Sequence, residues 1–278
     1  MKSAIFIYLP LLAELFCVTR DNNMDDFQPW QRVSTFSICA VNPRTGEAGV
    51  GVVSSHIAVG ALVPYAEPGA GAIATQAVIS PMYGTRGMEL LRKKVSAAEV
   101  IRRLTNEDVT ITPDDEKVFA YYATENMNKE GVHFVRDKQH RRVLWFTHYI
   151  RQVGVVDAQG RGAVHSGDCI FPIVASRTGD GFACQGNMLL GPEAVDAMAS
   201  AFEKARRESK TMLKSLLAAL QAGEASGGNK RGNKAASVLV VREKGHWSGT
   251  DRFCDVRVDH DDQPVAKLTK MALQYEET

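Results

Sequence analysis

Two apolar runs joined by a turn, close to the start of the chain, constrain its fold more strongly than any other stretch. The run Thr35–Val41, TFSICAV, alternates with a period of two, which is typical of a β-strand. In the following turn, NPRTGE, Pro43 presets a backbone angle and Gly46 permits a positive φ. The run AGVGVVSS then returns as a second strand, so the segment predicts a β-hairpin. Because the pair is apolar on both faces, we expect it to be covered on each side, as in a layered sandwich.

The other regular segments come in groups of strands and groups of helices. A capping-box pattern at Ser96 and Glu99 marks the start of one helix. Grouping of this kind predicts an α+β fold in which sheets pack together beneath helical outer layers. Strands are predicted at 69–80, 151–157, 162–167, 181–189, 235–241 and 251–259, and helices at 84–94, 96–104, 192–205, 212–223 and 264–275.

Two segments differ from this pattern. Residues 1–33 are predicted to be a leader or a disordered extension, because an apolar stretch of signal-peptide length at 1–18 precedes a polar tract. We favour a secretory signal, which implies a periplasmic or secreted protein. Extra coding sequence ahead of a start at Met24 would instead imply a cytoplasmic one. Residues 34–278 are expected to form a single domain, with a charged and aromatic insertion at about 105–149.

Composition and missing motifs exclude several kinds of site. The net charge of +1 indicates neither nucleic acid nor an acidic membrane surface as a partner. The sequence has no HExxH, GxSxG or GxxxxGK[ST] motif, so no zinc hydrolase, α/β-hydrolase or phosphate loop is indicated. The five cysteines show no CxxC spacing, and most lie in apolar runs as small hydrophobic residues. We therefore expect no metal and no cofactor.

Thr35, at the head of the first strand, is the remaining candidate for chemistry. A free N-terminal threonine attacks a carbonyl with its hydroxyl and uses its own α-amine as the base. The reference pKa of that amine is about 7.7–8.0, which suits work near neutral pH. Within a chain the nitrogen is an amide, so Thr35 acts in this way only if the Ser34–Thr35 bond is cut. Otherwise a threonine that starts a strand is ordinary.

Six blocks of the sequence, collinear over about 35–268, resemble the domain-of-unknown-function family 1028 (DUF1028). That family is placed in the N-terminal-nucleophile (Ntn) hydrolase superfamily. The resemblance therefore implies a four-layer αββα sandwich with the nucleophile at the start of the first strand. The blocks are TFSICAVNPRTGEAGVGVVSSHIAVGALVPYAEPGAGAIATQA, YGTRGMELL, RQVGVVDAQGR, GFACQGNMLLGPE, GGNKRGNKAASVLVV and DRFCDVRVDHDDQPVAKL.

The resemblance also implies a set of site residues. A side-chain amide in the QGN block could donate to a developing oxyanion, a role worth about 2.7–4 kcal/mol when the donor is well placed. Arg86 could hold a substrate carboxylate in a bidentate pair. The alternatives are turn chemistry for the amides, a structural hydrogen bond for His56 and an ion pair at a helix start for Arg86. The catalytic candidates are Thr35, Asn187 and Gln185, and the substrate-binding candidates are Ser54, Ser55, His56, Thr75, Gln76 and Arg86.

The sequence departs from the family pattern in three places. Thirty-four residues precede Thr35, Asn229 stands where an aspartate is usual, and the connection at 105–149 is longer than usual.

Our main hypothesis is an amidohydrolase that cleaves the C–N bond of a small amide or peptide through Thr35 after processing. The first alternative is a catalytically inactive Ntn-like binding or assembly module that keeps its leader, and the second is an exported ligand-binding protein. We expect no nucleic-acid partner and no membrane partner after processing. The sequence does not determine the oligomeric state, although sandwich proteins of this superfamily often form homo-oligomers.

Overall fold

The computed structural model describes residues 33–108, 134–136, 142–144, 148, 151–167, 170 and 173–277. The chain divides into two compact units. The first comprises Met1–Arg32 and Thr110–Phe146, and its described part is the antiparallel pair β5 (Phe134–Arg136) and β6 (Arg142–Leu144). The second unit, Val33–Val109 with Thr147–Thr278, holds all the other described elements and is called the main unit below. The predicted leader at 1–32 lies outside the described residues.

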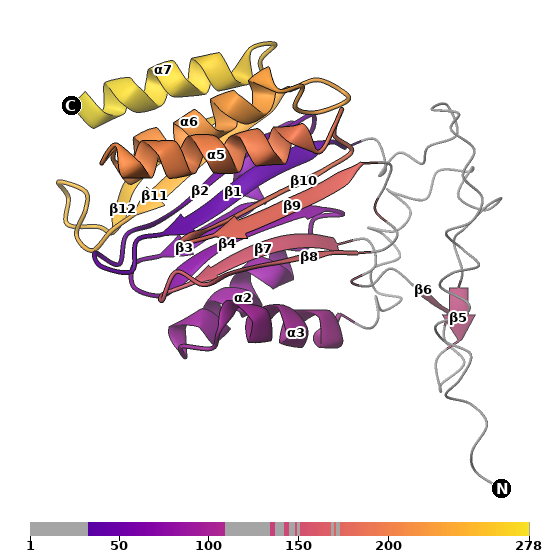
Figure 1. Cartoon of the computed structure of the whole chain (residues 1–278). Helices are drawn as coiled ribbons and strands as arrows, with labels where there is room; N and C mark the ends of the chain where they lie inside the picture. Colours follow the sequence, from indigo (N-terminus) through magenta and orange to yellow (C-terminus); the bar gives the residue numbers. More distant parts are fainter. Residues whose placement is uncertain are drawn as a thin grey trace, which may run out of the picture. The chain divides into compact units, whose positions relative to one another are not determined.

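The main unit contains two antiparallel sheets (Figure 1). The predicted hairpin forms the middle of the larger sheet, and its turn closes as expected, since Asn42 N–H donates to the Glu47 carbonyl (2.8 Å) and Gly46 has φ 73°. In spatial order the larger sheet comprises β12 (Arg252–Val258), β11 (Ala235–Val241), β2 (Ala48–Ser54), β1 (Thr35–Val41), β10 (Phe182–Asn187) and β9 (Val174–Gly179). The smaller sheet comprises β3 (Pro64–Glu67), β4 (Gly71–Ala77), β7 (Arg151–Asp157) and β8 (Gly162–Ser166).

Helices lie outside the two sheets. Figure 1 shows α5 (Glu193–Arg207), α6 (Met212–Ala225) and α7 (Pro264–Glu277) on one side of the strands, and α2 (Pro81–Arg92) and α3 (Ala97–Glu107) on the other. A short 3₁₀ turn, η3 (Val59–Ala61), follows β2. Ser96 caps α3 as predicted, since its side chain accepts the Glu99 N–H (3.4 Å). None of the described helices combines the length and apolarity needed to cross a bilayer.

Two predicted helix boundaries were wrong by three residues. Helix α2 begins at Pro81, three residues before the predicted start at Gly84, because proline fits the first helical turn, where no N–H is needed. Helix α3 continues through Glu107, so the first residues of the insertion expected from Thr105 belong to a helix. Most of the rest of that insertion lies outside the described residues.

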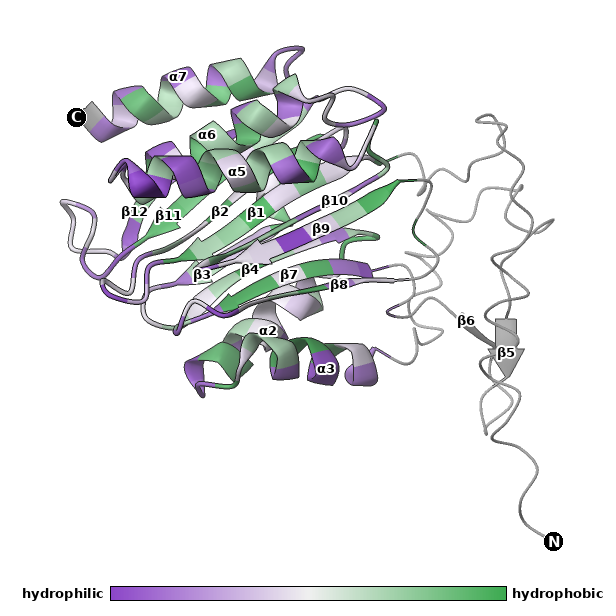
Figure 2. Cartoon of the chain, in the orientation of Figure 1, coloured by the Kyte–Doolittle hydropathy of each residue, from purple (hydrophilic) through white to green (hydrophobic). Residues whose placement is uncertain are grey.

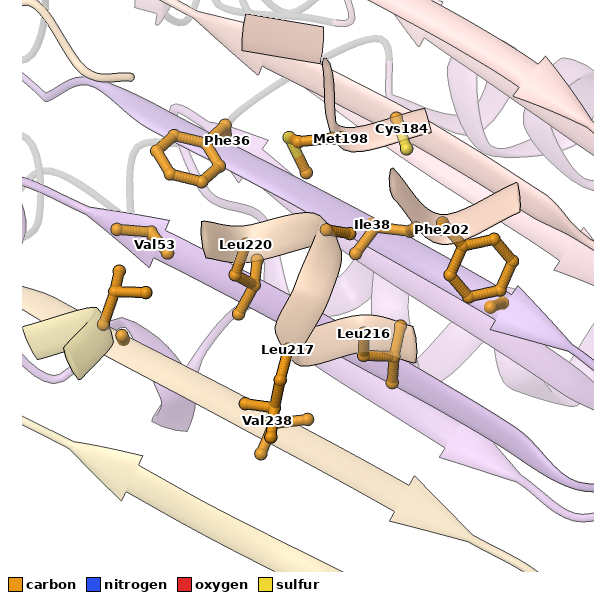
Figure 3. Packing of buried hydrophobic residues seen from close by; sticks show 14 of the residues in the cluster. Phe36, Ile38, Val53, Cys184, Met198, Phe202, Leu216, Leu217, Leu220 and Val238 are labelled. Carbon is orange, nitrogen blue, oxygen red and sulfur yellow. The ribbon is translucent and has the colours of Figure 1, made fainter. Parts of the chain in front are cut away.

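Side chains alternate between two environments along β1. Phe36, Ile38 and Ala40 pack with residues of α5 and α6, as Figure 3 shows for Phe36 and Ile38. Cys39 and Val41 face the other way, into a cluster shared with the smaller sheet. The period-two pattern therefore buries both faces of the strand, as the sequence predicts.

The smaller sheet has the same arrangement, with Ile73, Val153 and Val155 packed against the side chains of α2 and α3. In Figure 2 the strands β11, β2 and β1 are largely hydrophobic, whereas the helices carry residues of both kinds. The prediction of an α+β fold is confirmed, with helices covering the outer faces of two antiparallel sheets.

Candidate active site

Thr35 is the first residue of β1 and lies between two neighbouring strands. Its register partners are Ser54 on β2 and Asn187 on β10. The side chain is buried, with 1% of its surface exposed, and Thr35 Oγ1 lies 2.9 Å from Ser54 Oγ. Thr35 shares the face of Ser37 and Cys39, which points toward the smaller sheet.

Three donors surround the carbonyl oxygen of Ser34, the residue before the candidate nucleophile. The oxygen accepts from Ser55 N–H (3.0 Å), Ser54 Oγ (2.9 Å) and, at longer range, Ser55 Oγ (3.4 Å). Ser34 N–H donates to Ser55 Oγ (2.9 Å), so the backbone of Ser34 is held at both its N–H and its carbonyl. Donors aimed at a carbonyl oxygen polarise the bond and favour attack at its carbon.

The Ser54 hydroxyl determines where the Thr35 proton lies. A serine hydroxyl has one proton to donate and two lone pairs to accept with. Ser54 Oγ donates to the Ser34 carbonyl and accepts His56 N–H (2.9 Å). The remaining lone pair faces Thr35 Oγ1, so Thr35 donates its proton to Ser54. The threonine oxygen keeps its own lone pairs, which a nucleophile needs.

Beyond Thr35, carboxamide side chains connect the two sheets. Gln76 on β4 donates to the Thr35 carbonyl (3.3 Å) and accepts from Ser37 Oγ (2.6 Å). Ser37 in turn accepts from Gln185 Nε2 on β10 (2.8 Å). All four residues are buried, and the side chains of Gln76, Ser37 and Gln185 hold one another through these hydrogen bonds.

Gln152 on β7 joins this network and was missed by the sequence interpretation. Its Oε1 accepts from Gln76 Nε2 (2.7 Å) and Asn187 Nδ2 (3.0 Å). Its Nε2 donates to Ser166 Oγ (2.9 Å) and the Gly186 carbonyl (3.1 Å). Gln152 therefore fixes the orientation of two other amides. A polar residue at an inward position of an alternating strand was the available signal.

Gln185 occupies space that a glycine leaves open. A Cβ added to Gly154 on β7 would lie 2.1 Å from Gln185 Oε1, which is too close for any side chain at that position. Gln185 Oε1 is buried and, among the described residues, has no hydrogen-bond partner. A buried unpaired acceptor is costly unless a ligand or water satisfies it.

Left-handed backbone follows directly after two of these amide residues. Ala77, after Gln76, has φ 67°, and Met188, after Asn187, has φ 49°. This region is uncommon for residues other than glycine, and such conformations concentrate at functional sites. Both strands therefore turn sharply at the end where Thr35 lies.

Three of the predicted site residues do not take part in the network. Thr75 lies on the opposite face of β4 from Gln76, beside the layer of α2 and α3, and donates to the Ser80 carbonyl (3.3 Å). The His56 residue is half-buried, and its ring Nδ1 lies 2.6 Å from the Ile57 carbonyl, so only its backbone N–H reaches Ser54.

Arg86 sits on an exposed part of α2 and pairs with Glu107 and Glu89. These carboxylates, Glu107 first, raise the pKa of its guanidinium. This is the ion-pair alternative, and none of the contacts recorded for Arg86 involves the network around Thr35.

The cysteines of the described residues offer no competing nucleophile. Burial raises the pKa of Cys39 and of Cys254 to about 12, and it also raises the pKa of Cys184. Thiols with such values stay protonated near neutral pH and act as apolar side chains. In the part of the chain that the structure describes, no cluster of histidine, cysteine and carboxylate residues could hold a metal ion.

The comparisons with known proteins concern the family and the fold. A family model described as a family of unknown function, DUF1028, matches residues 35–117 and 138–268. The gap between the two matched ranges falls inside the insertion expected at 105–149. No curated protein matches the chain.

Twenty-six chains of solved structures also match. One is the crystal structure of protein SPO2555 from Silicibacter pomeroyi, likewise described by the DUF1028 family model. The two chains are 24% identical with a TM-score of 0.65, and the match covers 88% of this chain and 87% of that one. The likeness shows a shared fold.

Proposed function

The chain belongs to DUF1028, a family of unknown function, and we propose from the geometry of its site that it is an N-terminal-nucleophile amidohydrolase. In this proposal, cleavage of the Ser34–Thr35 bond frees Thr35, which then hydrolyses the C–N bond of a small amide or peptide. The succession of helices, two sheets and helices, with Thr35 opening the first strand, supports a four-layer αββα sandwich of the Ntn type.

The arrangement of Ser34, Thr35 and Ser54 is the observation that carries the proposal. The carbonyl that has to be attacked is polarised by donors from Ser54 and Ser55, and the hydroxyl beside it donates to Ser54. During cleavage the Ser34 carbon gains an oxygen from water, the C–N bond breaks and the Thr35 nitrogen takes up a proton. The product amine is the base that an N-terminal threonine uses.

After processing, the same groups serve an incoming substrate. The amine accepts the hydroxyl proton, Thr35 Oγ1 bonds to the substrate carbonyl carbon, and the leaving nitrogen departs with a proton. Water then hydrolyses the ester and regenerates Thr35. Asn187, the register partner of Thr35, carries the amide best placed to donate to the oxyanion. Gln185 lies two residues before Asn187 on β10 and positions Ser37 by donating a hydrogen bond to its hydroxyl.

One observation favours the alternative of an inactive module as long as the chain is uncut. Ser34 and Thr35 are 0% and 1% exposed, so a substrate does not reach the hydroxyl in the intact chain. Binding or assembly would then be the role of the unprocessed protein.

Intact mass measurement on protein from its native host, followed by N-terminal sequencing, tests the proposal. We expect a mature chain that begins at Thr35 and hydrolyses members of a panel of small amides. A fully competent protein that retains the Ser34–Thr35 bond would contradict the threonine mechanism and support the module.

A further inference from the structure

The glycine-rich loop at 226–234 crosses the end of the larger sheet where Thr35 lies. It connects α6 to β11, and its Lys234 N–H donates to the Ser54 carbonyl (2.8 Å). At its other side, Lys230 N–H donates to the Met188 carbonyl (3.1 Å), just beyond the end of β10.

The order of the strands fixes what this loop passes over. Between β11 and β10 lie β2 and β1. Neighbouring strands are about 4.8 Å apart, so the loop spans about 14 Å across the ends of both. Asn229 Nδ2 donates to the Val53 carbonyl (3.3 Å), and Val53 is the register partner of Phe36, one residue from Thr35. The loop therefore forms one rim of the end of β1.

Positive charge on this loop is only partly neutralised. Lys234 pairs with Asp262 (2.6 Å). Lys230 and Arg231 have no ion pair with any residue of the described ranges, and Arg231 Nε is buried there without a hydrogen-bond partner. A buried guanidinium N–H that no protein group satisfies is suited to a ligand that brings an acceptor.

We propose that Arg231, assisted by Lys230, holds a carboxylate of the substrate, so that the amide cleaved at Thr35 belongs to an anionic molecule such as an N-acyl amino acid or a peptide with a nearby free carboxylate. This inference rests on the proposed function. A guanidinium binds a carboxylate through two parallel hydrogen bonds, which fixes the substrate in orientation as well as in place. The sequence interpretation gave this role to Arg86, but glutamates already occupy that side chain.

The first experiment compares hydrolysis of matched pairs, N-acetyl amino acids against their neutral N-acetyl amino acid amides, by the mature protein. We expect the anionic member to be preferred about tenfold or more in kcat/KM, through KM. Arg231→Gln should remove the preference by lowering kcat/KM much more for the anionic member than for the neutral amide, and Arg231→Lys should restore part of it. Arg242→Gln, at the opposite end of β11, is the matched control and should change nothing.

Hydrolysis of neutral amides without any preference for the carboxylate would overturn this inference and leave the proposed function standing. If nothing is hydrolysed, the proposed function fails, and a binding measurement decides whether Arg231 holds a carboxylate at all. Saturation-transfer NMR should then detect N-acetylglycine on the wild-type protein, but not on Arg231→Gln, and should detect N-acetylglycinamide on neither. Equal binding of both probes, or binding of inorganic phosphate in place of N-acetylglycine, would overturn it.

Discussion

The space between the two sheets is apolar at one end and polar at the other, although the same strands line both. Away from Thr35 it is filled by valine and alanine side chains, among them Val50, Ala72 and Val156. Beside Thr35 the corresponding inward positions carry Gln76, Gln152 and other polar groups. Burying amides is costly unless they are paired, so a network of this kind adds little stability for its size. In the proposed function the polar end serves chemistry, whereas the apolar end holds the two sheets together.

The largest expected effect is on activity, at the polar end. Thr35→Ala should lower kcat/KM on any amide that the wild type hydrolyses by roughly a thousandfold or more, because the nucleophile is lost. Thr35→Ser should keep measurable activity. Ser215→Ala removes a buried hydroxyl of α6 that donates to the Thr211 carbonyl (2.8 Å), and it serves as the matched control. Unchanged hydrolysis by Thr35→Ala would end the threonine mechanism.

Two reciprocal substitutions on β7 directly test the difference between the polar and the apolar end of the space between the sheets. Gln152→Leu leaves the donors of Gln76 and Asn187 without an acceptor, and Val156→Asn puts an amide among apolar side chains. We expect each to lower the free energy of unfolding by about 2–4 kcal/mol. Urea denaturation measures this change. Only Gln152→Leu should also alter the activity of the folded fraction, and equal activity losses in both variants would contradict the division into two ends.

Gly154→Ala tests the packing of the polar end by adding a methyl group beside Gln185. The new Cβ would meet Gln185 Oε1 at 2.1 Å, so the amide must move away from Ser37. We expect a loss of about 1–3 kcal/mol in the free energy of unfolding, together with reduced activity. In the background of Gln185→Ala the same substitution should cost much less, because the clashing atoms are gone. A double-mutant cycle by thermal or chemical unfolding therefore tests the contact, and additive effects would argue against it.

The smallest expected effect concerns pH and the apolar end. Burial raises the pKa of Cys39 from 9.0 to about 12, so the thiol stays neutral in the folded state while it ionises in the unfolded chain. Its contribution to stability is fully present below pH 9 and is lost as the pH rises from 9 toward 12. At pH 10 we expect Cys39 to account for about 1 kcal/mol of lost stability.

Denaturation of wild type and Cys39→Ala at pH 8 and pH 10, under reducing conditions, measures this difference. The wild type should show the steeper fall with pH, and parallel behaviour would mean that the thiol is not buried as described.

Much of the fold was predictable because its signals are local. The alternation of Thr35–Val41, the turn around Gly46 and the cap at Ser96 each act within a few residues. The strands β3 and β9 were missed, because β3 has only four residues and β9 lies at a sheet edge with mixed exposure. Short or edge strands carry a weak periodic signal.

The candidate site was predictable only in part. Thr75 and Gln76 are neighbours in one strand, so alternation sends them to opposite faces, and the sequence interpretation named both. The structure brings Gln76 to Thr35 and turns Thr75 toward the layer of α2 and α3. Gln152 was not named at all, although it contacts three strands.

The sequence by itself determined the strand that begins at Thr35, the hairpin that follows it and the family to which both belong. Each depends on backbone preferences and on side-chain alternation over a few residues. Only the tertiary structure decided which amides meet between the sheets, since Ser37 and Gln185 are 148 positions apart and Gln76 and Gln152 are 76 apart. Their contact depends on strand register and on how two sheets face each other, and no local preference encodes either.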